Sequence, residues 1–181
     1  DLWLVPVAGG RASRLTSERT PVRHPRFSPD GSRIAYTKLT GGVPEVYVLD
    51  LVSGDVRQIT WWGVQHTYVD GWIDESHVLV ASAAGQPYRV RMWLHSVDLD
   101  GQAAALPYGT AMSGAFAPDG TIAVADWKTE ASGPDELRAR YGDQLRNYAA
   151  LINLATGRTV ARATIVAVHP TTGATAEVVV L

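Results

Sequence analysis

The chain of 181 residues contains no cysteine and no long apolar run. Without cysteine, neither disulfide bonds nor thiolate chemistry can contribute to the fold or the function. This agrees with a reducing compartment, and we expect a cytoplasmic location. No stretch approaches the ~20 apolar residues that a membrane helix requires, so we expect no membrane partner.

The chain also lacks an excess of either charge. It has 16 Lys and Arg against 18 Asp and Glu, a formal net charge of -2. No overall basic field therefore attracts nucleic acid, and any DNA binding needs a local patch. Hydrophobic residues make up 46% and charged residues 19%, which is typical of a packed globular chain and not of a disordered one.

A turn marker recurs three times. Its copies begin at Phe27, Trp72 and Phe116, so they are 45 and 44 residues apart. The first and third copies contain Pro-Asp-Gly, whereas the second, Trp-Ile-Asp-Glu-Ser, lacks both Pro and Gly. Each copy precedes a short apolar segment with strand character. We interpret Asp30 and Asp119 as turn residues, because Asp in this position caps its own backbone.

A second marker runs in phase with the first. It is an apolar strand that leads through a tight turn to another short strand, and its copies begin at Asp1, Glu45 and Arg91. Together the two markers predict four short strands per unit, joined by turns in which Gly supplies positive φ and Pro presets φ. Four strands in ~40–45 residues is typical of a β-propeller blade.

Residues 1–125 resemble the propeller repeats of the tricorn protease N-terminal region and of TolB-type proteins. The resemblance rests on His24–Thr37, Pro44–Thr60 and Asp1–Thr16, and the tricorn match is the closer one. In the tricorn family the propellers gate substrates or products, and the peptidase chemistry lies in later domains. The resemblance therefore implies a non-catalytic propeller fragment that binds or gates peptide or protein and needs no cofactor.

Residues 1–125 hold fewer than three such units, whereas closed propellers have four to eight blades. Open blade edges invite pairing with other chains, so we expect a partial ring that can self-associate through these edges. Trp61 and Trp62 follow the second unit. We expect them to pack between blades, with a peptide-binding surface as the alternative.

The pattern changes after residue 125. Ser132 is a plausible N-cap and Pro134 lies in the first turn of a predicted helix that stops at Gly157. Its predicted apolar face consists of Leu137, Tyr141, Leu145, Tyr148, Ile152 and Ala155. Strand-like segments follow at Thr159–His169 and Thr175–Leu181.

Residues 117–181 resemble the C-terminal half of a RecB-type nuclease domain of the PD-(D/E)XK superfamily. Asp126-Trp-Lys128 matches the acid-x-Lys pair on a strand, and Gln144 with Tyr148 matches the Gln-x-x-x-Tyr motif on the next helix. The resemblance implies that Asp126 and Lys128 are catalytic and that Asp126 binds Mg²⁺ or Mn²⁺. It also implies that DNA is a partner, with Gln144 and Tyr148 touching nucleic acid or bracing the site.

The residues themselves support part of this chemistry. Alternation along a strand puts Asp126 and Lys128 on one face, about 7 Å apart. The carboxylate could bind a divalent cation, and the ammonium could stabilise developing negative charge. The alternative is an ion pair at the end of a surface strand. For Gln144 and Tyr148, which share a helix face, the alternative is a polar helix shoulder with a tyrosine at the edge of the core.

One acid of the nuclease pattern is missing. The family places it in a Gly-x-x-Asp setting about a dozen residues before Asp126, where Tyr108–Phe116 contains no acid. A single carboxylate holds Mg²⁺ poorly, so the module is either incomplete or inactive. Ser113 lies in Ala-Met-Ser-Gly-Ala, which is not a nucleophile elbow. No metal role is expected for the scattered histidines: His24, His66, His77, His95 and His169.

The predicted fold is mainly β with an α/β tail. Residues 1–116 form a partial ring of under three four-stranded propeller blades, and residues 117–181 form a nuclease-like strand-helix-strand-strand segment. The first functional hypothesis is the non-catalytic propeller fragment, and the alternative is a metal-dependent DNA nuclease module. A third hypothesis is a recombined chain without a function of its own.

Overall fold

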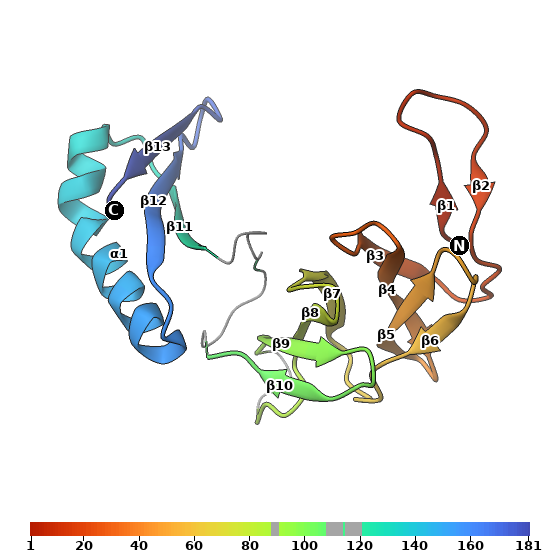
Figure 1. Ribbon diagram of the computed structural model, residues 1–181. Coiled ribbons are helices and arrows are strands. Elements are labelled where there is room, and N and C mark those ends of the chain that lie inside the picture. The colour runs from red at the N-terminus through yellow and green to blue at the C-terminus, as the bar shows by residue number, and fades with distance from the viewer. Residues whose placement is uncertain (88–90, 108–113, 115–120) are drawn as a thin grey trace. The chain divides into compact units, whose positions relative to one another are not determined.

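The computed structural model describes residues 1–87, 91–107, 114 and 121–181 (Figure 1). The chain divides into two compact units, Asp1–Phe116 and Ala117–Leu181. In the described part of the first unit, strands and turns form the regular structure, and the single helix α1 (Pro134–Thr156) belongs to the second unit. The third copy of the turn marker, Ser113 and Asp119 lie outside the described residues.

Two four-stranded antiparallel sheets form the body of the first unit. Their strands are β3 (Val22–Phe27), β4 (Arg33–Thr40), β5 (Val43–Asp50) and β6 (Val56–Gln58), then β7 (Thr67–Trp72), β8 (His77–Ser82), β9 (Trp93–Asp98) and β10 (Ala103–Ala105). In each sheet every strand pairs with the next one along the chain. These sheets are the predicted propeller blades, and the repeat found in the sequence is confirmed for both.

A third, two-stranded sheet precedes them, with β1 (Trp3–Leu4) and β2 (Ser13–Arg14). One backbone hydrogen bond, between the outer two strands, recurs in all three sheets: Leu15 N to Leu2 O at 2.9 Å, Ile59 N to Val46 O at 2.9 Å, and Leu106 N to Leu94 O at 2.8 Å. The β1–β2 hairpin is therefore equivalent to the outer half of a blade.

The two blades pack against each other through one apolar layer. Its buried members are Ala35, Val46, Val48, Ile59, Val69, Trp72, Val78, Val80 and Val97. The indole Nε1 of Trp72 also donates to Arg26 O at 3.0 Å, which joins β7 to β3. Alternating side chains on each strand thus fill the space between blades, as expected for sheets buried on both faces.

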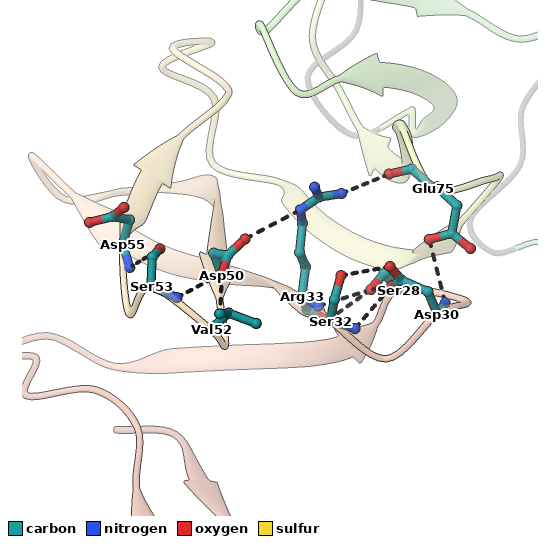
Figure 2. Close-up of polar contacts among 9 residues, drawn as sticks. All are labelled: Ser28, Asp30, Ser32, Arg33, Asp50, Val52, Ser53, Asp55 and Glu75. Atoms are coloured by element: carbon teal, nitrogen blue, oxygen red, sulfur yellow. Dashed lines mark hydrogen bonds and ion pairs between the residues drawn. The ribbon is translucent and has the colours of Figure 1, made fainter.

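The first Pro-Asp-Gly turn is held by its own aspartate, as predicted (Figure 2). Asp30 accepts hydrogen bonds from Ser28 Oγ at 2.6 Å, Ser32 N at 2.9 Å and Ser32 Oγ at 2.7 Å. These bonds favour the ionised carboxylate and lower the pKa of Asp30. The sequence-based assignment of Asp30 to turn chemistry is therefore confirmed.

The same turn reaches the next blade through the degenerate copy of the marker. Figure 2 shows the Arg33 side chain extending between Asp50 and Glu75. Its Nε lies 3.7 Å from Asp50 Oδ2, and its Nη1 donates to Glu75 O at 3.2 Å. Asp30 N donates to Glu75 Oε2 at 3.4 Å. Glu75 stands in the second copy of the marker where the first copy has Asp30, and it contacts the first blade through its side chain and its backbone carbonyl.

The second unit is a three-stranded sheet covered on one face by α1. Its strands are β11 (Ile122–Thr129), β12 (Val160–Val168) and β13 (Thr175–Val179), in the order β11-β12-β13. β11 and β12 are parallel, so α1 serves as their crossover, and β12 pairs antiparallel with β13. The predicted strand-helix-strand-strand order matches the observed elements.

Two details of the helix differ from the sequence prediction. Gly133, not Ser132, is the N-cap, and no side chain caps the helix start. Tyr148 is 43% exposed, whereas Ala149 is 2% exposed and continues the four-residue step from Leu145. The stop at Gly157 is confirmed, because this residue has φ of 66° and donates to Asn153 O at 3.0 Å.

The core of the second unit lies between α1 and the sheet. Its buried members are Leu137, Leu145, Ala163, Ile165, Ala167 and Val178. Val124 and Tyr141 pack against this cluster. In the parts of the chain that the structure describes, no helix is long and apolar enough to cross a membrane.

Candidate functional site

Asp126 and Lys128 lie together on the face of β11 that α1 covers. Asp126 Oδ2 is 3.0 Å from Lys128 Nζ, and each side chain is about one fifth exposed. The ammonium also lies 4.5 Å from the centre of the Tyr141 ring on α1. Val124, two residues earlier on the same face, contacts the core. The strand alternation predicted from the sequence thus brings the acid and the lysine into contact.

The position of this pair favours a structural role for the carboxylate. Asp126 Oδ2 is buried and makes no hydrogen bond of good geometry, so Lys128 is its compensating charge. A buried carboxylate without hydrogen bonds is costly unless a cation accompanies it. If a metal ion replaced Lys128 at this oxygen, the lysine would have to move. The geometry therefore resembles the ion-pair alternative at least as closely as a metal ligand.

Glu130 directly follows β11 and is an acid that the sequence motifs do not include. Its Oε2 accepts hydrogen bonds from Arg140 Nη1 at 3.0 Å and Tyr141 OH at 3.1 Å. Its Oε1 is buried without a hydrogen bond. The period of two along the strand, which linked Asp126 to Lys128, would also have found Glu130.

Glu130 does not replace the missing acid. Four residues of a strand span about 13 Å, and Lys128 lies between the two carboxylates in sequence. Among the described residues, no group of three or more His, Cys, Asp or Glu side chains is placed to hold a metal ion. The segment Tyr108–Phe116, where the family pattern expects the acid, is outside the described residues except for Gly114. The donors seen here do not fit a divalent cation.

Gln144 and Tyr148 contact each other on the exposed surface of α1. Gln144 Nε2 donates to Tyr148 OH at 2.8 Å. Both side chains are solvent-exposed, and the structure gives no contact between either of them and Asp126 or Lys128. The helix spacing predicts the pair correctly, but nothing in their contacts shows a role in the site.

A different cluster lies on the innermost strands of the two blades, β3 and β7, which run next to each other. It contains Arg23, His24 and Arg26 from β3 and Tyr68 and Asp70 from β7. We call this cluster the inner-strand surface. The imidazole of His24 lies against the Tyr68 ring, with centroids 5.2 Å apart.

The backbone of β3 is strained at the centre of the inner-strand surface. His24 has φ of 53°, a value that residues other than glycine rarely adopt. The pairing of β3 with β4 shifts register between Arg23 and Arg26, which marks a bulge. Bulges re-aim side chains, and strain of this kind persists where the surrounding structure enforces it. No sequence pattern identified this feature.

The electrostatics of the inner-strand surface are mostly positive. Burial is the main cause that lowers the pKa of His24, followed by the charges of Arg26 and Arg23. Arg26 Nε donates to Asp70 O and Arg26 Nη1 to Pro25 O, both at 3.0 Å. The side chain of Arg23 makes no hydrogen bond or ion pair to any described residue. Its guanidinium is therefore available to a ligand.

The two tryptophans behave differently. Trp62 packs against the layer between the blades, and its ring lies 5.1 Å from that of His95, which confirms the packing prediction for this residue. Trp61 is 67% exposed, so the same prediction is wrong for its side chain. Adjacent residues of an extended chain point in opposite directions, which explains the difference.

Antiparallel four-stranded sheets that meander in sequence order and pack face to face define the first unit as β-propeller structure. The chain belongs to the family described as the tricorn protease N-terminal beta propeller domain, which matches residues 1–148. The match includes β11 and much of α1. The tricorn resemblance is therefore confirmed, whereas no comparison shows the RecB-type resemblance, which stays a prediction.

Individual relatives agree with this family. The chain is 40% identical over 133 residues to tricorn protease homolog 1 of Streptomyces coelicolor, covering 73% of this chain and 12% of that protein. The crystal structure of the tricorn protease matches with a TM-score of 0.60 and 25% identity, covering 65% of this chain and 12% of that one. The chain thus spans about an eighth of the length of these relatives.

TolB-type proteins share the fold. The crystal structure of TolB from Acinetobacter baumannii matches with a TM-score of 0.54 and 23% identity, covering 66% of this chain and 30% of that one. At this identity the match speaks for the fold alone, and it confirms the TolB-like neighbours expected from the repeats.

Proposed function

We propose that this chain is a non-catalytic propeller module that binds or gates peptide or protein, in the cytoplasm and without a cofactor. Its membership of the tricorn N-terminal propeller family supports the proposal. The observation that carries it is the inner-strand surface, where a strained His24 lies next to Arg23, whose guanidinium has no partner among the described residues.

This surface is suited to an acidic segment. A guanidinium binds a carboxylate through two parallel N–H donors, and the bond is stronger than one between neutral groups. The Tyr68 ring beside His24 offers an apolar contact to the same ligand. A peptide with Asp or Glu side chains should therefore bind more tightly than a basic one of equal length.

The test compares two fluorescein-labelled heptapeptides that differ only in three positions, Glu in one and Lys in the other. We expect the acidic peptide to bind in fluorescence anisotropy and Arg23→Gln to weaken it by about three- to tenfold, the loss of one charge-assisted contact. Arg11→Gln removes the same charge from the exposed β1–β2 connection and is the matched control. Equal weakening by both variants, or equal binding of the basic peptide, contradicts the proposal.

A metal-dependent DNA nuclease remains the second candidate, with Asp126 and Lys128 as catalytic residues and Gln144 and Tyr148 as DNA contacts or braces. The parallel β11–α1–β12 arrangement supports it, because it places the acid and the lysine in contact on one face. Two observations weigh against activity. The match to the tricorn propeller family extends across Asp126, Lys128, Gln144 and Tyr148. Among the described residues of this segment, Asp126 also has no second carboxylate with which to hold a metal ion.

Cleavage of supercoiled plasmid and of single-stranded DNA with Mg²⁺ or Mn²⁺ decides this candidate. The nuclease hypothesis requires that wild-type protein cleaves and that Lys128→Ala loses most of the activity. Equal background cleavage by both proteins removes the hypothesis. Gln144→Ala, which lies on the exposed helix surface, then tests for DNA contact independently of chemistry.

A further inference from the structure

His24 lies on the inner-strand surface between two complete blades. β3 and β7 are each the first strand of a four-stranded sheet, and the two strands contact each other. The imidazole of His24 packs against the ring of Tyr68 from the neighbouring sheet, with centroids 5.2 Å apart, and His24 is nevertheless solvent-exposed. The protein therefore holds one side of the ring, and a ligand can still reach it.

The backbone of β3 gives His24 its place in a group of cations. In a regular strand, Arg23 and His24 would point to opposite faces of the sheet. His24 instead has φ of 53°, and the pairing with β4 shifts register between Arg23 and Arg26. A bulge of this kind interrupts the alternation and re-aims side chains. Both arginines are close enough to act on the charge of His24.

The groups around His24 oppose its protonation in the free protein. Partial burial is the main cause that lowers its pKa, followed by the charges of Arg26 and Arg23, whereas Asp70 on β7 raises it. Tyr68 carries no charge near neutral pH, because burial raises its pKa above the ordinary value of 10.0. The free inner-strand surface therefore favours a neutral imidazole.

The cations of β4, the other strand packed against β3, already have partners. Lys38 Nζ lies 3.2 Å from Glu18 Oε2, and Arg33 Nε lies 3.7 Å from Asp50 Oδ2. Among the described residues of β3, β4 and β7, His24 is the group whose ordinary pKa, about 6.5, lies close to neutral pH. A change of charge on these strands near neutral pH is therefore a change at His24.

We propose that His24 is a second contact for the acidic segment that Arg23 binds, and that this binding is accompanied by uptake of a proton at His24. The inference rests on the proposed function, because it concerns the same surface and the same ligand. A carboxylate beside an imidazole favours the imidazolium, so the ligand offsets the effect of the two arginines. Linkage is reciprocal, so the proton that the ligand helps to bind also strengthens the binding of the ligand. The surface therefore holds acidic segments more tightly as the pH falls.

The test uses the acidic heptapeptide in fluorescence anisotropy at pH 7.5 and pH 5.5. We expect the wild-type Kd to fall about three- to fivefold between these values, the size of one exposed charge pair. The peptide's glutamates stay largely ionised at pH 5.5, because their pKa is about 4.3. His24→Asn should abolish the pH dependence, since Asn is neutral and tolerates a positive φ. His77→Asn, which removes an exposed imidazole at the start of β8, is the matched control and should retain it.

Calorimetry measures the proton directly. Titration of the peptide at pH 6.5 in two buffers with different ionisation enthalpies gives the number of protons bound with it. We expect uptake by the wild type and by His77→Asn, and none by His24→Asn. Circular dichroism of all three proteins checks that the β-sheet signal is unchanged.

The outcomes separate this inference from the proposed function. If the acidic peptide binds and Arg23→Gln weakens it, but the Kd is the same at both pH values, the proton linkage is wrong and the proposed function stands. The linkage is also wrong if His24→Asn keeps the pH dependence or the proton uptake of the wild type. Absence of peptide binding at both pH values overturns the inference and the proposed function together.

Discussion

The first unit repeats one local arrangement, whereas the second uses each of its elements once. The same backbone bond closes the outer strand pair at Leu15, Ile59 and Leu106. In the second unit, a single helix joins two parallel strands that are far apart in sequence. Repeated local contacts produce a repeat that can be recognised in the sequence. A single crossover between two distant strands leaves no such repeat, so it is recognised only in the folded structure.

The two units also satisfy their buried polar groups differently. Glu45 is 3% exposed and accepts hydrogen bonds from Thr60 Oγ1 at 2.5 Å and Gly63 N at 2.8 Å. Asp126 and Glu130 of the second unit each keep a buried oxygen without a hydrogen bond. The carboxylate of Glu45 is thus hydrogen-bonded within its own repeat. In the second unit the cations Lys128 and Arg140 form ion pairs with Asp126 and Glu130, respectively.

The largest expected effect tests whether the units are independent. Leu145→Ala removes a fully buried side chain from the small core of the second unit and should cost about 2–5 kcal/mol of its unfolding free energy. Hydrogen exchange should show lost protection in β12 and unchanged protection in β4 and β8. Leu79→Ala, equally buried in the first unit, is the matched control and should give the reverse pattern. Loss of protection in both units from either variant would show that they unfold together.

A smaller effect is expected within the repeat itself. Thr60→Val removes the acceptor for Val46 N and a donor to the buried Glu45, so it should cost about 1–3 kcal/mol. Thr16→Val removes only the equivalent acceptor for Leu2 N in the half blade and should cost less. Urea unfolding of both variants measures the difference. Equal costs would mean that the pairing with Glu45 adds nothing.

The ion pair of the second unit should contribute about 0.2–1 kcal/mol, because both side chains are partly exposed. A double-mutant cycle with Asp126→Asn and Lys128→Met measures the coupling. We expect Lys128→Met alone to be the more destabilising single change, since it leaves a buried carboxylate oxygen without its cation. A coupling energy of zero would argue against the structural role and would favour a functional one.

The smallest effect concerns pH and separates the units again. Burial lowers the pKa of His95 below its ordinary value of 6.5. The unfolded chain therefore binds the proton first as the pH falls, and the first unit loses stability from about pH 6.5 downward. Thermal unfolding between about pH 7.5 and pH 5.5 should show this slope, and His95→Gln should flatten it. An unchanged slope in the variant would assign the effect to other groups, His24 first among them.

Much of the fold could be read from the sequence, because its information is local. The Pro-Asp-Gly turn at Phe27–Gly31, the four-strand period and the stop at Gly157 each depend on a few neighbouring residues. The predicted burial of Tyr148 was wrong because the packing of α1 on the sheet, not local propensity, selects which residues are buried. The predicted N-cap was wrong by one residue, since the extended residue before the helix is Gly133 and not Ser132.

The candidate sites were less predictable. Strand alternation correctly placed Asp126 with Lys128, and helix spacing placed Gln144 with Tyr148. The inner-strand surface could not be found in this way, because it combines residues 42 to 47 positions apart and depends on a backbone bulge. Glu130 could have been found by extending the same alternation by two residues.

The sequence by itself determined the blades, since each repeat encodes its own strands, turns and side-chain caps. Only the tertiary structure decided which side chains are buried. Trp61 and Trp62 are neighbours in the sequence, yet Trp61 is 67% exposed and Trp62 packs against the layer between the blades. Burial depends on the residues that the fold brings around a side chain, and most of these residues lie far away in the sequence.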